Sequence, residues 1–250
     1  MVKHIAAVGK GGTGKTTFSA LTARYLMEQR KGAILAVDAD PNANLNEALG
    51  LEITTTISEL IEQTKDPKAL PVGMSKETFI EYKLQDSLVE TQMLDLLVMG
   101  GPQGPGCYCY PNDLLCKYME RLESGYDYLI IDSEAGMEHI SRRTIQDIDY
   151  LFIISDASVR GIRTAKRVND LVKGLKSKIG AVNLVVTKAT PKLMEELSPV
   201  IEETGIPFIG WVPFDAMVTE YDAEGQPLSK LPADSPVVKA TYEILKKAGI

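Results

Sequence analysis

Cysteine is scarce in this chain: only three occur among 250 residues, and all three lie within positions 107–116. So few thiols in one short segment do not make a framework of structural disulfides. They fit functional thiols in a reducing compartment. The composition therefore favours a cytoplasmic protein whose cysteines have a chemical task.

Long apolar runs are also missing. No stretch of about 18 uninterrupted apolar residues exists, so we expect no transmembrane helix. The amino terminus enters its first apolar run almost at once, without the basic and apolar regions of an export signal. The net charge of −7 argues against nonspecific DNA as the main partner, because an acidic surface repels phosphates. We expect neither a membrane nor a nucleic-acid partner.

Short apolar runs alternate with amphipathic helical patterns along the chain, which predicts a parallel sheet covered by helices on both faces. The expected strands are Ile5–Val8, Ile34–Val37, Leu94–Met99, Tyr128–Ile131, Leu151–Ile154, Leu184–Val186 and Phe208–Val212. The expected helices are Thr16–Glu28, Asn112–Glu123, Ser158–Leu175 and Pro191–Thr204, with short helices over one sheet edge between Thr54 and Gln92. Residues 1–250 therefore fit one doubly wound, mostly parallel α/β domain.

The segment Gly9–Thr16 follows the first predicted strand and reads Gly-Lys-Gly-Gly-Thr-Gly-Lys-Thr. It matches the phosphate-loop pattern G-x-x-x-x-G-K-[ST] in the strand–loop–helix context that the pattern requires. Glycines let backbone N–H groups face a phosphate chain, and the following helix adds its positive end. We expect Lys15 to reach the β- and γ-phosphates and the Thr16 hydroxyl to bind Mg²⁺.

Carboxylates end two of the predicted strands. Asp38 and Asp40 follow the second apolar run, and Asp132 follows the run at 128–131. Because ligands of parallel sheets bind at the carboxyl ends of the strands, these side chains are expected beside the phosphate loop. Four apolar residues followed by Asp132 form the Walker B arrangement, which holds Mg²⁺, usually through water.

The cysteines form a Cys-x-Cys pair, Cys107 and Cys109, followed by Cys116. In an extended loop, residues i and i+2 point the same way, so the pair can present two thiolates to one soft or borderline metal ion. Two ligands are too few for a closed tetrahedral Zn²⁺ site or a square-planar Ni²⁺ site. A twofold dimer would bring a second pair and complete four thiolates. Cys116 falls on the following predicted helix, where a buried packing role is favoured over a ligand role.

Lys10 gives the phosphate loop a second lysine, near its beginning. The loop therefore resembles the deviant Walker A motif of the family that includes MinD, ParA, the nitrogenase iron protein, the arsenite pump ATPase and the CooC proteins. The resemblance implies an ATPase in which Lys10 crosses a dimer interface and contacts the partner's nucleotide. A cation supplied in this way would neutralise charge on the transferring phosphoryl group, as an arginine finger does.

The same resemblance assigns roles to the strand-end carboxylates. It implies that Asp40 orients the attacking water and that Asp38 lies beside the magnesium shell. It also implies that Asp132–His139 is a switch that responds to the γ-phosphate. The expected catalytic residues are Lys10, Lys15, Asp40 and Asp132.

Nucleotide contacts are expected in three segments. Those of the phosphate loop are Gly11, Gly12, Thr13, Gly14, Lys15, Thr16 and Thr17. Thr187-Lys188 stands where family members often carry Asn followed by a basic residue, so threonine here departs from the pattern. Trp211–Asp215 resembles the second adenine loop of the family, with Pro213 and Asp215 as contacts. A guanine-reading Asn-Lys-x-Asp is absent, so ATP is expected rather than GTP.

Cys107-x-Cys109, Lys10 and Asp132–His139 together resemble the CooC family over essentially the whole chain. CooC proteins insert nickel into carbon monoxide dehydrogenase, and their relative AcsF acts on acetyl-CoA synthase. The resemblance implies a cytoplasmic ATPase that dimerises with nucleotide, holds a metal between its subunits and serves one of these two client enzymes. The residues leave Ni²⁺ and Zn²⁺ open, because thiolates bind both.

Other members of the wider family are alternatives. A reductase like the iron protein would need a cysteine in the second switch, and Ser133–His139 contains none. A MinD-like protein would need a basic amphipathic C-terminal helix, whereas Pro236–Ile250 has the pattern of an ordinary packing helix. A ParA-like protein would use a basic DNA-binding face, which the net charge disfavours. A MinD/ParA-like positioning ATPase, with a membrane- or DNA-associated protein as partner, is the alternative function.

Overall fold

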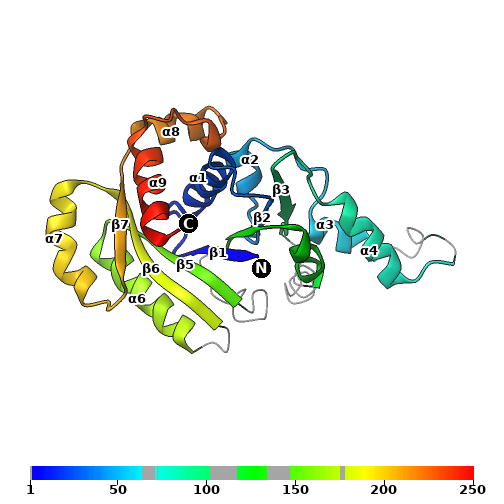
Figure 1. Cartoon of the computed structure of the whole chain (residues 1–250), viewed down its shortest axis with the longest axis horizontal. Helices are drawn as coiled ribbons and strands as arrows, with labels where there is room; N and C mark the ends of the chain where they lie inside the picture. Colours follow the sequence, from blue (N-terminus) through cyan, green and yellow to red (C-terminus); the bar gives the residue numbers. More distant parts are fainter. Residues whose placement is uncertain (1, 64–70, 72, 102–116, 134–146, 175–177) are drawn as a thin grey trace.

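A computed structural model describes residues 2–63, 71, 73–101, 117–133, 147–174 and 178–250 (Figure 1). Its centre is a seven-stranded sheet in the order β3-β2-β4-β1-β5-β6-β7, and every neighbouring pair is parallel. The strands are β1 (Lys3–Val8), β2 (Ile34–Asp38), β3 (Leu94–Val98), β4 (Tyr128–Asp132), β5 (Asp147–Asp156), β6 (Lys178–Ala189) and β7 (Phe208–Pro213). Each predicted strand is present, and the doubly wound parallel α/β class is confirmed.

Helices connect these strands and lie on both faces of the sheet. They are α1 (Lys15–Glu28), α2 (Leu45–Leu49), α3 (Ile57–Gln63), α4 (Lys76–Asp86), α6 (Val159–Lys173), α7 (Pro191–Glu202), α8 (Ala216–Ala223) and α9 (Pro236–Ala248), with the short 3₁₀ helices η2 (Glu123–Gly125) and η4 (Leu228–Lys230). Helices α6 and α7 begin where Ser158 and Thr190 accept hydrogen bonds from backbone N–H groups of the first turn. Such capping satisfies donors that have no partner inside the helix.

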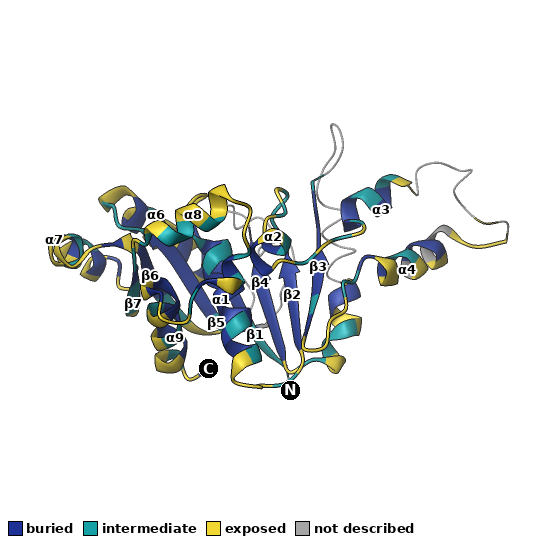
Figure 2. Cartoon of the chain, turned by 90° about the horizontal axis from the view of Figure 1, so that it is seen from above, coloured by how far each residue is buried: buried dark blue, intermediate teal, exposed yellow. Residues whose placement is uncertain are grey.

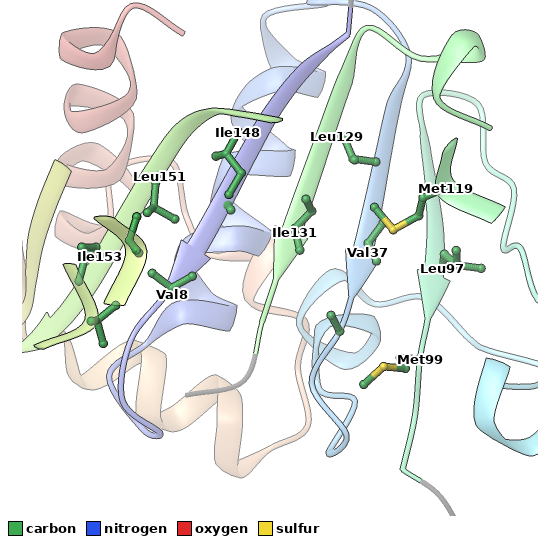
Figure 3. Close-up of a cluster of buried hydrophobic side chains, with 14 of the residues drawn as sticks. Val8, Val37, Leu97, Met99, Met119, Leu129, Ile131, Ile148, Leu151 and Ile153 are labelled. Carbon is green, nitrogen blue, oxygen red and sulfur yellow. The ribbon is translucent and has the colours of Figure 1, made fainter. Parts of the chain in front are cut away.

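The two faces of the sheet carry two separate apolar clusters. Ile5 and Ala7 of β1 pack with residues of α1, α2 and α9 on one face. Ala6 and Val8 point the other way, toward α3, α4, α6 and α7. Part of this second cluster is seen in Figure 3, where Val8, Ile131 and Ile153 lie along neighbouring strands. Because successive strand residues face opposite sides, a strand buried on both faces needs the nearly continuous apolar sequence seen here.

The helices expected at the sheet edge and at the C-terminus are present, and one further predicted helix is described only in part. Helices α3 and α4 project past edge strand β3, as Figure 2 shows, which confirms the short helices expected between Thr54 and Gln92. Helix α9 packs against α1 and β7, so the C-terminal segment is a packing helix. In the helix expected at Asn112–Glu123, residues 117–122 are helical and 112–116 lie outside the described residues. Among the described helices, none is long and apolar enough to cross a membrane.

Candidate nucleotide-binding site

The phosphate loop connects the carboxyl end of β1 to the first turn of α1. Gly9 has φ +149°, and a Cβ there would lie 2.1 Å from the Ile154 carbonyl oxygen of neighbouring strand β5. Gly14, which precedes α1, has φ +87°. Both positions require glycine, the first because the loop passes so close to β5 and the second because of the left-handed backbone. The loop therefore holds a fixed path above the sheet.

Polar contacts bind the loop to itself and to the end of β6. The Thr13 hydroxyl donates to the Lys10 carbonyl at 2.8 Å, and the Lys15 amine lies 3.3 Å from the same oxygen. From β6, the Thr187 hydroxyl donates to the Thr13 carbonyl at 2.6 Å, and the Lys188 amine donates to the Gly12 carbonyl at 2.8 Å. Thr187 and Lys188 are predicted as nucleotide contacts, and in the structure their side chains hold the phosphate loop.

The two lysines of the loop lie in different surroundings. Lys15 begins α1 and is only 6% exposed. Lys10 is exposed and shares a surface hollow with arginines of α6. Lys15 is therefore placed inside the phosphate loop, whereas Lys10 is available at the surface. This difference fits the separate roles predicted for them.

Asp38 and Asp132 lie opposite one another at the ends of paired strands β2 and β4. Both are buried, with exposures of 0% and 1%. Burial and the charge of Asp132 raise the pKa of Asp38 to about 7, although backbone N–H groups of Leu45 and Asp40 at 2.8 and 3.0 Å oppose the shift. Burial raises the pKa of Asp132 to about 6 against the opposing effects of the Thr16 hydroxyl and the Lys15 charge. Two buried carboxyls beside a hydroxyl form an oxygen-rich pair suited to a divalent cation.

Asp40 lies two residues beyond β2 and is half-buried. Its carboxylate accepts hydrogen bonds from the Asn42 backbone N–H and side-chain amide, both at 2.9 Å. Its charge acts on both Asp38 and Asp132, so all three acidic groups belong to the same edge of the sheet. The sequence prediction of their proximity is correct.

A largely apolar pocket opens beside the phosphate loop, at the ends of β6 and β7. Its lining residues are Gly14, Thr17, Phe18, Thr187, Lys188, Val212, Pro213, Phe214, Asp215, Val218, Thr219, Val237 and Thr241. Among them are predicted nucleotide contacts: Gly14, Thr17, Thr187, Lys188, Pro213 and Asp215. Asp215 also accepts from the Met217 N–H at 3.0 Å and the Ser235 hydroxyl at 2.8 Å, so it fixes the start of α8.

Sequence reasoning missed one wall of this pocket, formed by Val237 and Thr241 of α9. These residues lie far along the chain from the phosphate loop and carry no nucleotide-binding motif. They reach the pocket because α9 packs on α1 and β7. The sequence indicated that Pro236–Ile250 is a packing helix, but not the surface on which it packs.

Cys107, Cys109 and Cys116 lie outside the described residues, as do Glu134–His139 of the predicted second switch. Within the part of the chain that is described, no group of three or more His, Cys, Asp or Glu side chains could hold a metal ion. The described residues therefore form the nucleotide half of the predicted site.

Comparison with known proteins agrees with this geometry. The family model of the CobQ/CobB/MinD/ParA nucleotide-binding domain matches residues 4–228. An uncharacterized ATP-binding protein of Methanocaldococcus jannaschii is 41% identical over 97% of both chains. The carbon monoxide dehydrogenase accessory protein CooC of Rhodospirillum rubrum is 29% identical, over 88% of this chain and 87% of its own.

A solved structure has the same fold. The septum site-determining protein MinD of Pyrococcus horikoshii, in complex with Mg-ADP, superposes with a TM-score of 0.68 over 98% of this chain and 94% of its own, at 22% identity. The phosphate loop, the paired strand-end carboxyls and the family match lead to one assignment. The chain belongs to the CobQ/CobB/MinD/ParA nucleotide-binding domain family and is a P-loop ATPase.

Proposed function

We propose that this protein is an ATP-hydrolysing metallochaperone that holds nickel between two subunits. In this proposal, residues 1–250 form one cytoplasmic ATPase domain that supports nickel insertion into carbon monoxide dehydrogenase or acetyl-CoA synthase. The observation that carries it is the Cys107-x-Cys109 pair in a P-loop ATPase. The relationship to CooC, at 29% identity over most of both chains, supports it.

The nucleotide would be held by three groups of residues. Backbone N–H groups of Gly11–Thr17 face the phosphates, and the Lys15 amine leaves the Lys10 carbonyl to reach the β- and γ-phosphates. The pocket between α1, β7 and α9 takes the base, and Thr187, Lys188, Pro213 and Asp215 belong to its lining. The apolar walls suit a stacked adenine ring.

Magnesium fits the oxygen-rich end of the site. The Thr16 hydroxyl would bind Mg²⁺ directly. Asp38 and Asp132 would hold its water shell, because they lie at the ends of β2 and β4, beside the phosphate loop. When bound, Mg²⁺ neutralises charge on the β- and γ-phosphates. A nearby dication also favours the ionised carboxyls, which burial alone disfavours.

Hydrolysis requires a positioned water and a cation at the leaving group. Asp40 would accept a hydrogen bond from the attacking water once its carboxylate turns from Asn42. Lys10 would act on the nucleotide of the second subunit, which its surface position permits. Positioning and charge stabilisation of this kind supply most of the rate enhancement in phosphoryl transfer.

The nickel ion is cargo rather than a resident cofactor. Cys107 and Cys109 from two chains would supply four thiolates, which suit Ni²⁺ and also Zn²⁺. Because the ligands are divided between chains, metal would tighten the dimer and the dimer would tighten metal binding by the same factor. Nucleotide acts on the same equilibrium through Lys10, so hydrolysis would loosen the thiolate site and release metal to the client.

A MinD/ParA-like positioning ATPase is the second candidate. The observation that favours it is the relationship to a Synechocystis MinD, 25% identical over 90% of this chain. Its partner would be a membrane- or DNA-associated protein. A function of this kind does not require the cysteine pair, which separates the two candidates.

Equilibrium dialysis with Ni²⁺, with and without ADP or ATP and read against oligomeric state, tests the proposal. Wild-type protein should bind one Ni²⁺ per dimer, and Cys107→Ser with Cys109→Ser should abolish that binding while nucleotide affinity is unchanged. Cys116→Ser is the matched control and should retain the metal. If the double variant still binds one Ni²⁺ or Zn²⁺ per dimer with similar affinity, the metallochaperone assignment is wrong.

A further inference from the structure

Two consecutive side chains at the carboxyl end of β6 contact carbonyl groups of the phosphate loop. The Thr187 hydroxyl donates to the Thr13 carbonyl at 2.6 Å, and the Lys188 amine donates to the Gly12 carbonyl at 2.8 Å. Thr187 is buried, with an exposure of 5%, whereas Lys188 is exposed. One strand end therefore fixes two neighbouring peptide groups of the loop.

The backbone departs from regular strand geometry where it makes these contacts. In a regular strand, consecutive side chains point to opposite faces, so Thr187 and Lys188 would not both reach one loop. Lys188 has φ +55°, a left-handed conformation that residues other than glycine seldom adopt. The pairing of β6 with β7 is irregular between Val186 and Ala189. Such irregularities redirect side chains and occur often at functional sites.

The Thr187 hydroxyl is fully engaged by the protein. A threonine hydroxyl carries a single hydrogen. This hydrogen is directed at the Thr13 carbonyl, and the Ser155 carbonyl of β5 lies 3.2 Å from the same hydroxyl oxygen. An asparagine amide, which family members often carry at this place, offers two hydrogens and can donate to a second acceptor. Thr187 therefore has no donor left for a base.

A fixed carbonyl also fixes the N–H group of the residue that follows it. The peptide group is planar and trans, so its carbonyl oxygen and its N–H point in opposite directions. Because the Thr13 carbonyl is turned toward Thr187, the N–H of Gly14 is turned away from it. Gly14 immediately precedes α1, where backbone N–H groups bind phosphate. Thr187 thus orients a donor of the phosphate cradle through the loop backbone.

We propose that Thr187 is a positioning residue for the phosphate end of the nucleotide and does not read its base. Its hydroxyl holds the Thr13 carbonyl and thereby directs the Gly14 N–H toward the phosphates, while Lys188 holds the preceding carbonyl. Removal of the hydroxyl therefore weakens a ligand without a base as much as it weakens ATP. This inference rests on the nucleotide site of the proposed function and is independent of nickel binding.

The test compares ATP with inorganic tripolyphosphate, both with Mg²⁺, on the full-length protein. Competition against a fluorescent methylanthraniloyl-ADP measures the two dissociation constants. Thr187→Val keeps the shape of the side chain and removes the hydroxyl, so it should weaken both ligands by about fivefold, the usual effect of one hydrogen bond. Thr187→Ser restores the hydroxyl and should recover most of both affinities. A base contact would instead weaken ATP alone.

Thr204→Val is the matched control, because it makes the same change at a threonine that is equally buried, with an exposure of 6%. The Thr204 hydroxyl donates to the Ile201 carbonyl at 2.7 Å, near the amino end of β7 and hence at the edge of the sheet opposite to the phosphate loop. This variant should keep both affinities within about twofold of wild type. Thermal unfolding without ligand checks that each variant is folded.

If Thr187→Val does not fold, Lys188→Met replaces it, since this exposed position tolerates change and its amine holds the Gly12 carbonyl. It should weaken ATP and tripolyphosphate by the same factor. The proposal is wrong if either variant weakens ATP but not tripolyphosphate, or if both affinities match wild type. It is also wrong if Thr187→Ser binds as weakly as Thr187→Val, or if the Thr204 control does. Wild-type protein that binds neither ligand would overturn the nucleotide site itself.

Discussion

The phosphate loop and the neighbouring strand ends carry opposite charges on the same edge of the sheet. At the end of β1, Lys15 and backbone N–H groups form a cradle for an anion, and hydrogen bonds from Thr187 and Lys188 hold its shape. At the ends of β2 and β4, Asp38 and Asp132 are buried together with raised pKa values. The phosphate loop is therefore stabilised by hydrogen bonds within the chain, whereas burial destabilises the ionised forms of the two carboxyls.

The two halves of the site therefore differ in stability. Lys10 is exposed, and the phosphate loop is held by its own hydrogen bonds. Asp38 and Asp132 have exposures of 0% and 1%, and burial disfavours their ionised forms. A nucleotide carrying magnesium would complement both halves at once, the triphosphate on one side and the dication on the other.

The largest expected effect comes from the cationic half. Lys10→Ala should nearly abolish ATP turnover, because it removes the charge proposed to act on the second subunit's nucleotide. The folded protein should still bind ADP, since Lys15 and the loop backbone remain. Steady-state hydrolysis and ADP titration measure the two effects. Hydrolysis at the wild-type rate would show that Lys10 does not act in trans.

The next effect comes from the acidic half. Asp40→Asn should slow hydrolysis by about 10²-fold or more, because it removes the group that positions water. The variant should accumulate as an ATP-bound dimer, which size-exclusion chromatography with radiolabelled nucleotide detects. Rapid hydrolysis by this variant would show that another residue positions the attacking water, and Glu134 is the first residue to test.

The third effect is on stability rather than turnover, and it depends on pH. Asp38 has a pKa of about 7 in the folded protein and 3.8 as its ordinary value. The folded state therefore holds a proton that the unfolded state releases, so stability falls as pH rises from about 4 to about 7 and is level above that. Urea unfolding without Mg²⁺ measures this loss, to which Asp38 contributes at most about 4 kcal/mol.

Asp38→Asn isolates that contribution. Because the amide stays neutral, the variant should lose less stability than wild type between pH 4 and pH 7. Its side-chain oxygen must serve both the Asp40 and Leu45 N–H groups, so we expect an offset of about 1 kcal/mol at all pH values. Parallel pH profiles for the two proteins would contradict the buried-charge explanation.

Much of the fold followed from local patterns. The apolar runs Ile34–Val37 and Tyr128–Ile131 predicted buried parallel strands, and both strands extend by one residue to include the acidic groups Asp38 and Asp132. The glycine pattern of residues 9–14 predicted the phosphate loop, because only glycine tolerates the backbone at Gly9 and Gly14. These inferences succeeded because backbone conformation and burial on both faces restrict which residues can occur.

Residues close together in the chain were enough to identify the strand–loop–helix unit, the acidic strand ends, the cysteine pair and the family resemblance. The order of the strands depends on long-range packing, and it is this order that places Asp38 and Asp132 opposite one another. Long-range packing also brought Thr241 of α9 to the base pocket and Lys10 to the arginines of α6. Such contacts arise from the packing of whole helices on the sheet, and no local sequence pattern specifies the surface against which a helix packs.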